Sequence, residues 1–185
     1  MVFDAQADIV NVGTVTLDTT VTFEFYMYYT SSGYTTGANY YRIIEISSAS
    51  PLYMIRSQGL DMEFYYDQAL TSTGGEFDTN GVFLHTVVSI NSKYVTIYVN
   101  GTSVKGPTLN SNIANDTYTG MMFGPGSTAS DHWMNFTLAY VRIWNGVALS
   151  ASDVKTLYAN RENRERFNFN VCGKSARSVA QGAAE

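Results

Sequence analysis

The sequence predicts an all-β fold in which two antiparallel sheets pack as a sandwich, with one short helix near the end and a C-terminal extension. Three observations predict it: β-branched and aromatic residues recur in short alternating runs, turn-forming residues separate the runs, and only one stretch has apolar residues at helical spacing. The chain has 185 residues, of which 45% are hydrophobic, so we expect one domain with a single core.

The first half of the chain contains four strand patterns. Residues 14–29 are predicted to form one long strand, because apolar side chains recur there at every second position. The core face of this strand would consist of Val21, Phe23, Phe25 and Met27. Three shorter runs, each predicted to be a half-buried strand, lie at residues 40–46, 52–56 and 60–66.

A pair of hairpins is the clearest local pattern. Residues 83–90 and 94–99 are strand-like and flank a three-residue turn, and Asn100-Gly101 leads into residues 102–104. Asn-Gly between two β-prone runs favours a type I′ turn, because both central residues of that turn need a positive φ. We therefore predict an antiparallel meander.

One more strand and one helix complete the pattern. Residues 136–144 are apolar at both alternating sets of positions, which predicts a strand covered on both sides. Ser150 or Ser152 can cap the helix that follows, and Asp153 lies near its positive end. The apolar stripe at helical spacing consists of Val154, Leu157 and Tyr158.

The composition changes at residue 161. Residues 161–185 contain five basic and three acidic residues, whereas residues 1–160 contain six basic and thirteen acidic ones. We therefore expect a domain at 1–160 and a separate tail at 161–185. A small, polar tail of this kind is ordinarily disordered in a free monomer. We expect it to act as an arm that binds neighbouring subunits of a larger assembly.

Charge and composition exclude several classes of protein. The net charge of −5 disfavours nucleic acid as a partner, because binding to a phosphate backbone requires clustered Lys and Arg. The single cysteine, Cys172, cannot form an intrachain disulfide. The first residues lack the basic start and apolar stretch of a signal peptide, and no apolar run is long enough to span a membrane. We expect a soluble chain without membrane insertion.

Two stretches of the chain resemble the laminin-G-like, concanavalin A-like lectin-glucanase superfamily of jelly-roll proteins. His85 begins an alternating apolar strand, and the next strand ends in Asn100-Gly101, as in the family's hairpin. The family's closing strand, turn and short helix are matched at residues 141–144, 148–150 and 153–158. The resemblance implies a jelly-roll sandwich over most of residues 1–160. It implies less about function, because the superfamily includes lectins, glycan-binding modules, adhesion domains, glucanases and structural subunits.

A strand face rich in tyrosine and carboxylate is the candidate binding site. Asp61, Glu63 and Tyr65 are spaced two apart and would share the polar face of one strand. Nine of the fourteen tyrosines lie between positions 26 and 66, and Tyr41 is the fourth residue that we assign to this site. Tyrosine rings beside carboxylates suit a sugar, which offers C–H faces for stacking and hydroxyls for hydrogen bonds. The alternative is that outward tyrosines contact another subunit.

The same carboxylates raise glycosidase chemistry as a further interpretation. Asp61 and Glu63 would lie about 6.5–7 Å apart along a strand, between the separations of retaining and inverting enzymes. Glucanases of the resembled superfamily have the pattern Glu-x-Asp-x-x-Glu, which would require glutamates in place of Gly59 and Phe64. Because both glutamates are missing, we expect no catalytic residues and no enzyme.

A polar loop supplies the candidate metal site. Glu76, Asp78 and Asn80 alternate before a glycine, and their oxygens are ligands of the kind that Ca²⁺ prefers. The acidic residue that the family often has before the strand at 141–144 is absent here, which weighs against a calcium site implied by the resemblance. His85 is expected at the edge of the sandwich, without the partners that zinc needs.

These observations predict a non-enzymatic recognition module that binds carbohydrate and is displayed as a subunit of a larger assembly. The alternative is a purely structural subunit, such as a minor protein of a virus particle, whose tyrosine face and tail bind neighbouring proteins. A glycoside hydrolase is the third interpretation.

Overall fold

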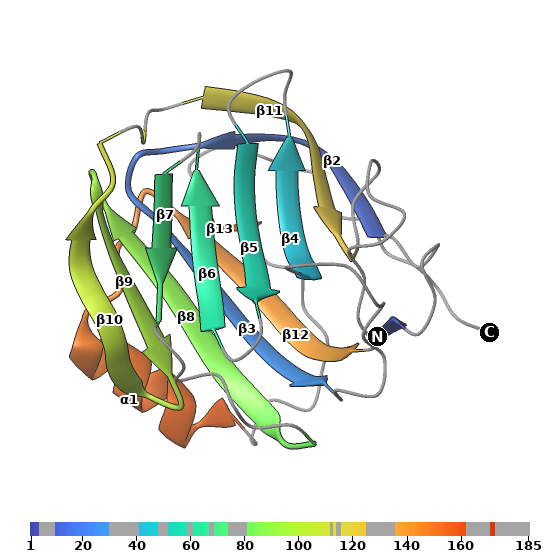
Figure 1. Ribbon diagram of the computed structural model, residues 1–185, viewed down its shortest axis with the longest axis vertical. Coiled ribbons are helices and arrows are strands. Elements are labelled where there is room, and N and C mark those ends of the chain that lie inside the picture. The colour runs from blue at the N-terminus through green and yellow to red at the C-terminus, as the bar shows by residue number, and fades with distance from the viewer. Residues whose placement is uncertain are drawn as a thin grey trace.

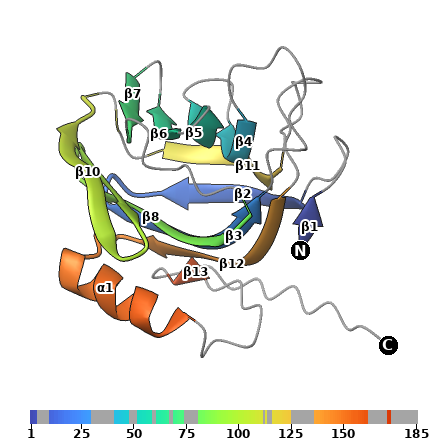
Figure 2. The same ribbon diagram turned by 60° about the horizontal axis from the view of Figure 1, so that its bottom comes forward.

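The computed structural model describes eleven parts of the chain, at residues 1–3, 10–29, 41–47, 52–58, 61–66, 69–73, 81–111, 113, 116–124, 136–161 and 171–172. The strands in these parts form two sheets packed face to face, as Figures 1 and 2 show. All strand pairs are antiparallel except the short pair of β12 and β13. The predicted all-β, two-sheet fold with one short helix is confirmed.

The first sheet has seven strands. In spatial order they are β1 (Val2–Phe3), β12 (Phe136–Asn145), β3 (Val21–Tyr29), β8 (Phe83–Asn91), β9 (Tyr94–Val99) and β10 (Thr102–Leu109), with β13 (Val171–Cys172) also beside β12. The second sheet has six, which are β2 (Val10–Leu17), β11 (Asp116–Phe123), β4 (Tyr41–Ser47), β5 (Leu52–Gln58), β6 (Asp61–Tyr66) and β7 (Ala69–Ser72).

The prediction of one long strand at 14–29 is wrong, because the chain turns at residues 18–20 and changes sheet. Asp18 forms this turn, since its carboxylate accepts a hydrogen bond from the backbone N–H of Thr20 at 3.0 Å. Asn145 ties the turn to the end of β12: its amide donates to the carbonyl of Thr16 at 3.0 Å and accepts from the N–H of Asp18 at 2.8 Å. The predicted strand is therefore two strands, β2 and β3, in different sheets.

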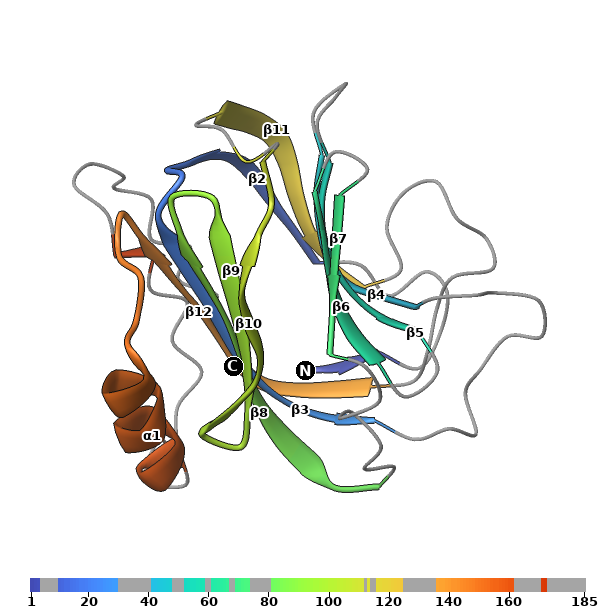
Figure 3. The ribbon, with the colours of Figure 1, turned by 60° about the vertical axis from the view of Figure 1, so that its left-hand side comes forward.

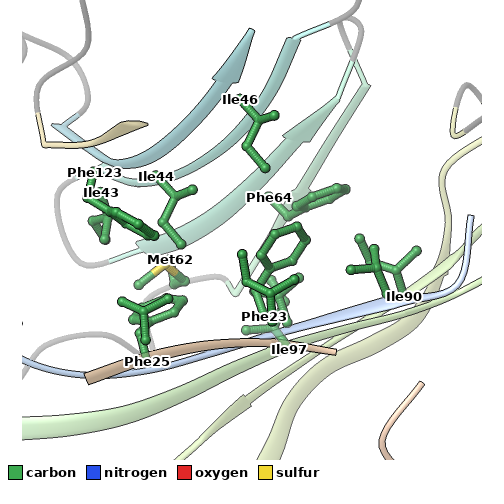
Figure 4. Packing of buried hydrophobic residues seen from close by; sticks show 14 of the residues in the cluster. Phe23, Phe25, Ile43, Ile44, Ile46, Met62, Phe64, Ile90, Ile97 and Phe123 are labelled. Carbon is green, nitrogen blue, oxygen red and sulfur yellow. The ribbon is translucent and has the colours of Figure 1, made fainter. Parts of the chain in front are cut away.

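The core lies between the two sheets, as Figure 4 shows. The predicted core face of β3 is confirmed, since each of its four residues is at most 1% exposed. Across from it, the six-stranded sheet contributes Ile44, Ile46, Met62, Phe64 and Phe123. Because β-branched and aromatic residues alternate with polar ones on both sheets, the two apolar faces bury each other and leave two outer faces.

The predicted meander is β8–β9–β10. Asn100 and Gly101 both have positive φ, of 49° and 79°, as a type I′ turn requires. The Asn100 side chain accepts a hydrogen bond from the N–H of His85 at 3.1 Å, and its own N–H donates to the carbonyl of His85 at 2.8 Å. These bonds tie the turn to β8.

Helix α1 (Ala151–Ala159) lies outside the seven-stranded sheet, on the side away from the other sheet, as Figure 3 shows. Of the two candidate caps the structure uses Ser150, whose hydroxyl accepts from the N–H of Asp153 at 3.3 Å, while Asp153 accepts from the N–H of Ser150 at 3.0 Å. Val154 is fully buried and packs with Val87 and Tyr98 on the outer face of the sheet. Burial raises the pKa of the Tyr98 hydroxyl. No helix in the described parts has the length and hydropathy to cross a membrane.

Candidate binding surfaces

The outer face of the six-stranded sheet holds the predicted sugar site. The core side of β6 consists of three residues that are at most 1% exposed: Met62, Phe64 and Tyr66. Because successive residues of a strand point to opposite faces, Asp61, Glu63 and Tyr65 occupy the outer side. Tyr65 is half-buried there.

Glu63 is far more buried than the sequence suggests. Its side chain is 2% exposed, although it lies on the face away from the core. The strand register pairs Glu63 with Arg56 on β5 and with Ser72 on β7, and Arg56 with Arg42 on β4. The backbone register thus places Glu63 in a cross-strand row with two arginine positions, one on the neighbouring strand and one on the strand beyond it.

Tyr41 occupies a different register position from the other predicted residues. It pairs with Ser57, which in turn pairs with Met62, whose side chain is in the core. Partners in an antiparallel ladder share a face, so the register aligns Tyr41 with the core row instead of the row of Glu63. The part that Tyr41 plays in binding stays a prediction.

The predicted calcium loop, Glu76, Asp78 and Asn80, lies outside the described residues. Within the described parts of the chain, no group of three His, Cys, Asp or Glu residues is placed to hold a metal ion.

A second polar site, which sequence reasoning missed, lies on the outer face of the seven-stranded sheet. Glu24 of β3 is fully buried there. Its Oε1 lies 2.8 Å from Nε2 of His85 on β8 and accepts a 3.1 Å hydrogen bond from the hydroxyl of Tyr140 on β12. Its Oε2 accepts from Nη1 of Arg142 at 3.5 Å. Three neighbouring strands therefore converge on one carboxylate.

His85 is buried at the middle of this network. The expectation that it lies at the edge of the sandwich is wrong, because β8 runs between β3 and β9. Its Nδ1 is buried without a hydrogen-bond partner, and Nε2 is the ring nitrogen that faces Glu24, so Nε2 carries the proton donated to the carboxylate. The ring also lies 5.8 Å from that of Tyr158, which connects the network to helix α1.

A group of aromatic side chains, one exposed and two half-buried, borders the network. Phe83 of β8 is 41% exposed, and its ring centroid lies 4.9 Å from that of Tyr26 and 5.4 Å from that of Tyr28, both on β3. Tyr26 also lies 5.8 Å from Tyr140, over which the guanidinium of Arg142 is placed at 4.9 Å. We call Tyr26, Tyr28 and Phe83 the aromatic ledge. Because the Tyr26 ring lies beside that of Tyr140, the aromatic ledge adjoins the buried network around Glu24.

Comparisons with known proteins place this architecture. The sequence model of the concanavalin A-like lectin/glucanases superfamily matches residues 4–155. A search of curated proteins found no match.

Three solved structures illustrate the similarity of fold. The binding domain of botulinum neurotoxin serotype D is similar with a TM-score of 0.63 at 14% identity, over 86% of this chain and 42% of that one. The ligand-binding domain of the same serotype in complex with N-acetylneuraminic acid gives 0.64 at 14% identity, with coverage of 86% and 42%. The native heptameric SAP-like pentraxin from Limulus polyphemus gives 0.59 at 13% identity, with coverage of 81% and 75%.

This chain therefore spans less than half of the two toxin domains. At these identities the similarity concerns the jelly-roll fold alone, whereas the matched sequence model covers most of the chain. The protein belongs to the concanavalin A-like lectin/glucanases superfamily.

Proposed function

We propose that this protein is a non-enzymatic carbohydrate-recognition module that binds sugar on the outer face of the six-stranded sheet, around β6. One observation carries the proposal: Met62, Phe64 and Tyr66 fill the core, so Tyr65 and two carboxylate residues share the opposite face of the same strand. The fold supports it, since the similar structures include a toxin domain described in complex with N-acetylneuraminic acid.

The residues of this surface have separate tasks in the proposal. Tyr65 stacks on the C–H face of a sugar ring, and Asp61 accepts hydrogen bonds from sugar hydroxyls. Glu63, which is 2% exposed, lies behind these two residues, and its negative charge offsets the positive charge of the arginine positions in the cross-strand row. Tyr41 stays a predicted contact, at a register position on β4 outside the row of Glu63. Calcium bound by Glu76, Asp78 and Asn80 would be an additional contact for sugar hydroxyls.

The absence of catalysis is part of the proposal. A glycosidase of this superfamily would need a third carboxylate where the chain has Phe64, and Phe64 is fully buried in the core. Glu63 is also enclosed, which does not suit a residue that must reach a glycosidic bond and a water molecule.

A role as a subunit of a larger assembly, such as a virus particle, is the second part of the proposal. It rests on charge: residues 161–185 carry five basic and three acidic residues, whereas residues 1–160 carry six basic and thirteen acidic ones. A basic arm and an acidic body attract each other between neighbouring copies.

A glycan array tests the sugar-binding proposal. We expect the wild-type protein to bind a defined set of glycans, and Tyr65→Ala to lose at least tenfold in affinity, because the stacking ring is removed. Tyr94→Ala is the matched control, since Tyr94 is 51% exposed on the other sheet and should leave binding unchanged. Loss of binding with a chelator would support the calcium loop.

Two outcomes would contradict the proposal. Equal binding by wild type and Tyr65→Ala would show that the β6 surface is not the sugar-binding site. No glycan binding with or without calcium would favour the purely structural subunit, for which size-exclusion chromatography of the full chain against a chain ending at residue 161 would show loss of self-association.

A further inference from the structure

The outer face of the seven-stranded sheet has aromatic and charged residues that are suited to binding a second ligand. The register places its residues in three successive rows: Tyr28 opposite Phe83, Tyr26 between Tyr140 and His85, and Glu24 opposite Arg142. Rows two residues apart are separated by about 6.5–7 Å along a strand, so the rows of Phe83 and Arg142 lie roughly 13 Å apart along the strands. Strands β8 and β12 lie on either side of β3, which adds about 10 Å across the sheet, so the two backbone positions are about 16 Å apart. A short oligosaccharide spans that distance.

The aromatic ledge combines apolar ring faces with unused polar groups. Phe83 is exposed and Tyr26 and Tyr28 are half-buried. Among the contacts of the described residues, the hydroxyls of Tyr26 and Tyr28 form no hydrogen bond, and each hydroxyl has both donor and acceptor capacity. Rings that offer a stacking surface together with free hydroxyls fit the alternating C–H and O–H groups of a sugar.

Arg142 gives this surface a positive group with spare donors. Its side chain is 21% exposed, and its guanidinium lies over the ring of Tyr140, with Nη1 in a 3.5 Å contact with Glu24. A guanidinium has five N–H donors in a planar fork that matches a carboxylate. The carboxylate of Glu24 is itself fully buried and shared by His85 and Tyr140, which fixes the position of Arg142, whose side chain is partly exposed.

We propose that this face binds an acidic oligosaccharide: one sugar ring stacks on Phe83 and Tyr28, and the carboxylate of another sugar residue of the same oligosaccharide is held by Arg142. The inference goes beyond the proposed function, because it concerns the opposite sheet and a charged ligand. Uronates and sialates share the chemistry that the surface recognises, a pyranose ring with a carboxylate.

The test compares acidic saccharides with their neutral forms. Full-length protein is titrated calorimetrically with oligogalacturonate, hyaluronan fragments and sialyllactose, each beside its methyl ester. We expect at least one acid to bind and its ester to bind at least tenfold more weakly, because the ester cannot form the charge-assisted pair with Arg142. Raising the salt concentration should weaken binding of the acid and leave the ester unaffected.

Variants then locate the site. Phe83→Ala should lose about tenfold in affinity for the acid. Arg142→Lys should lose a similar factor, because a point charge replaces the planar fork. Leu109→Ala is the matched surface control, since Leu109 is 59% exposed on β10. Phe83 is exposed, so its variant keeps the test valid if the Arg142 variant does not fold.

The results separate this inference from the proposed function. Acid binding that Phe83→Ala weakens and Tyr65→Ala does not would establish the second surface. Acid binding that only Tyr65→Ala weakens would support the β6 surface and overturn the second one. Equal affinity for acid and ester would also overturn the second surface. So would the absence of saccharide binding together with loss of self-association in Phe83→Ala, which would instead indicate a protein contact at this face.

Discussion

The two outer faces of the sandwich each bury a carboxylate on an inner strand, but they do so in different surroundings. Glu63 on β6 is 2% exposed in a cross-strand row with two arginine positions. Glu24 on β3 is fully buried and accepts hydrogen bonds from three side chains on two neighbouring strands, with α1 packed over part of the same face. Figure 3 shows the helix on this side of the molecule.

The difference shows that a strand pattern predicts the face on which a carboxylate lies but not how deeply it is buried. Alternation fixes the face of the sheet on which a carboxylate lies, whereas its depth depends on the size and charge of neighbours on adjoining strands. A residue that looks solvated in sequence, such as Glu24 between Phe23 and Phe25, can therefore be the most enclosed charge of its sheet.

Replacing Glu24 is expected to have the largest effect. Glu24→Ala leaves His85, Tyr140 and Arg142 without their shared acceptor, and breaking a buried charge pair costs about 3–5 kcal/mol of the free energy of unfolding. Urea denaturation measures it. Glu24→Gln is the matched control, because it keeps an acceptor for His85 and Tyr140 and should lose less. If the two variants were equally destabilised, the shared acceptor would not be the cause.

Much of the fold could be predicted because its determinants are local. The alternation of Phe23, Phe25 and Met27 fixed the core face of β3, and Asn100-Gly101 marked the turn between β9 and β10. The capping box of α1 needs only Ser150 and Asp153, three residues apart. Each of these patterns is complete within a few residues, so sequence alone contains the physical cause.

The break between β2 and β3 shows where such patterns fail. The β-branched run continues through residues 18–20, and only the carboxylate of Asp18, which bonds to the N–H two residues later, indicates the turn. Because the composition is typical of a strand on both sides of this turn, the change of sheet was not predicted. Strands β1, β7, β11 and β13 were missed because neither their sequences nor their turns stand out.

The candidate sites were predicted only in part. The outward position of Glu63 and Tyr65 followed from the period of β6, but the burial of Glu63 did not. The network around Glu24 joins residues 61 and 118 positions away, so no local pattern could assemble it. One signal was present: Glu24 and Arg142 each interrupt an apolar strand, and opposite charges on two such strands favour pairing.

The helix that distinguishes the seven-stranded sheet gives the next prediction. Val154→Ala should reduce the free energy of unfolding by roughly 2 kcal/mol, because a fully buried side chain that packs on Val87 and Tyr98 loses two carbons. Val147→Ala, at a 43% exposed valine just before the helix, is the matched control and should change stability little. Similar losses in both variants would mean that α1 contributes no packing to this face.

The smallest effect is expected at the start of the same helix, and it should depend on pH. Hydrogen bonds from the side chain and then the backbone of Ser150 lower the pKa of Asp153 from its ordinary value of 3.8. Because the folded pKa lies below the unfolded one, the cap contributes its full stability above about pH 4 and loses it as the pH falls through the lowered value.

Asp153→Asn removes this contribution, so its thermal midpoint should lie below that of the wild type at neutral pH, by less than for Val154→Ala. The gap should close as both proteins are acidified to about pH 2. Other carboxylates titrate in both proteins and cancel in the difference. If the difference in thermal midpoint stayed constant across this range, the effect of Asp153→Asn would come from side-chain packing and not from the charge of the cap. The packing of Val154 would then be what holds α1 on the seven-stranded sheet.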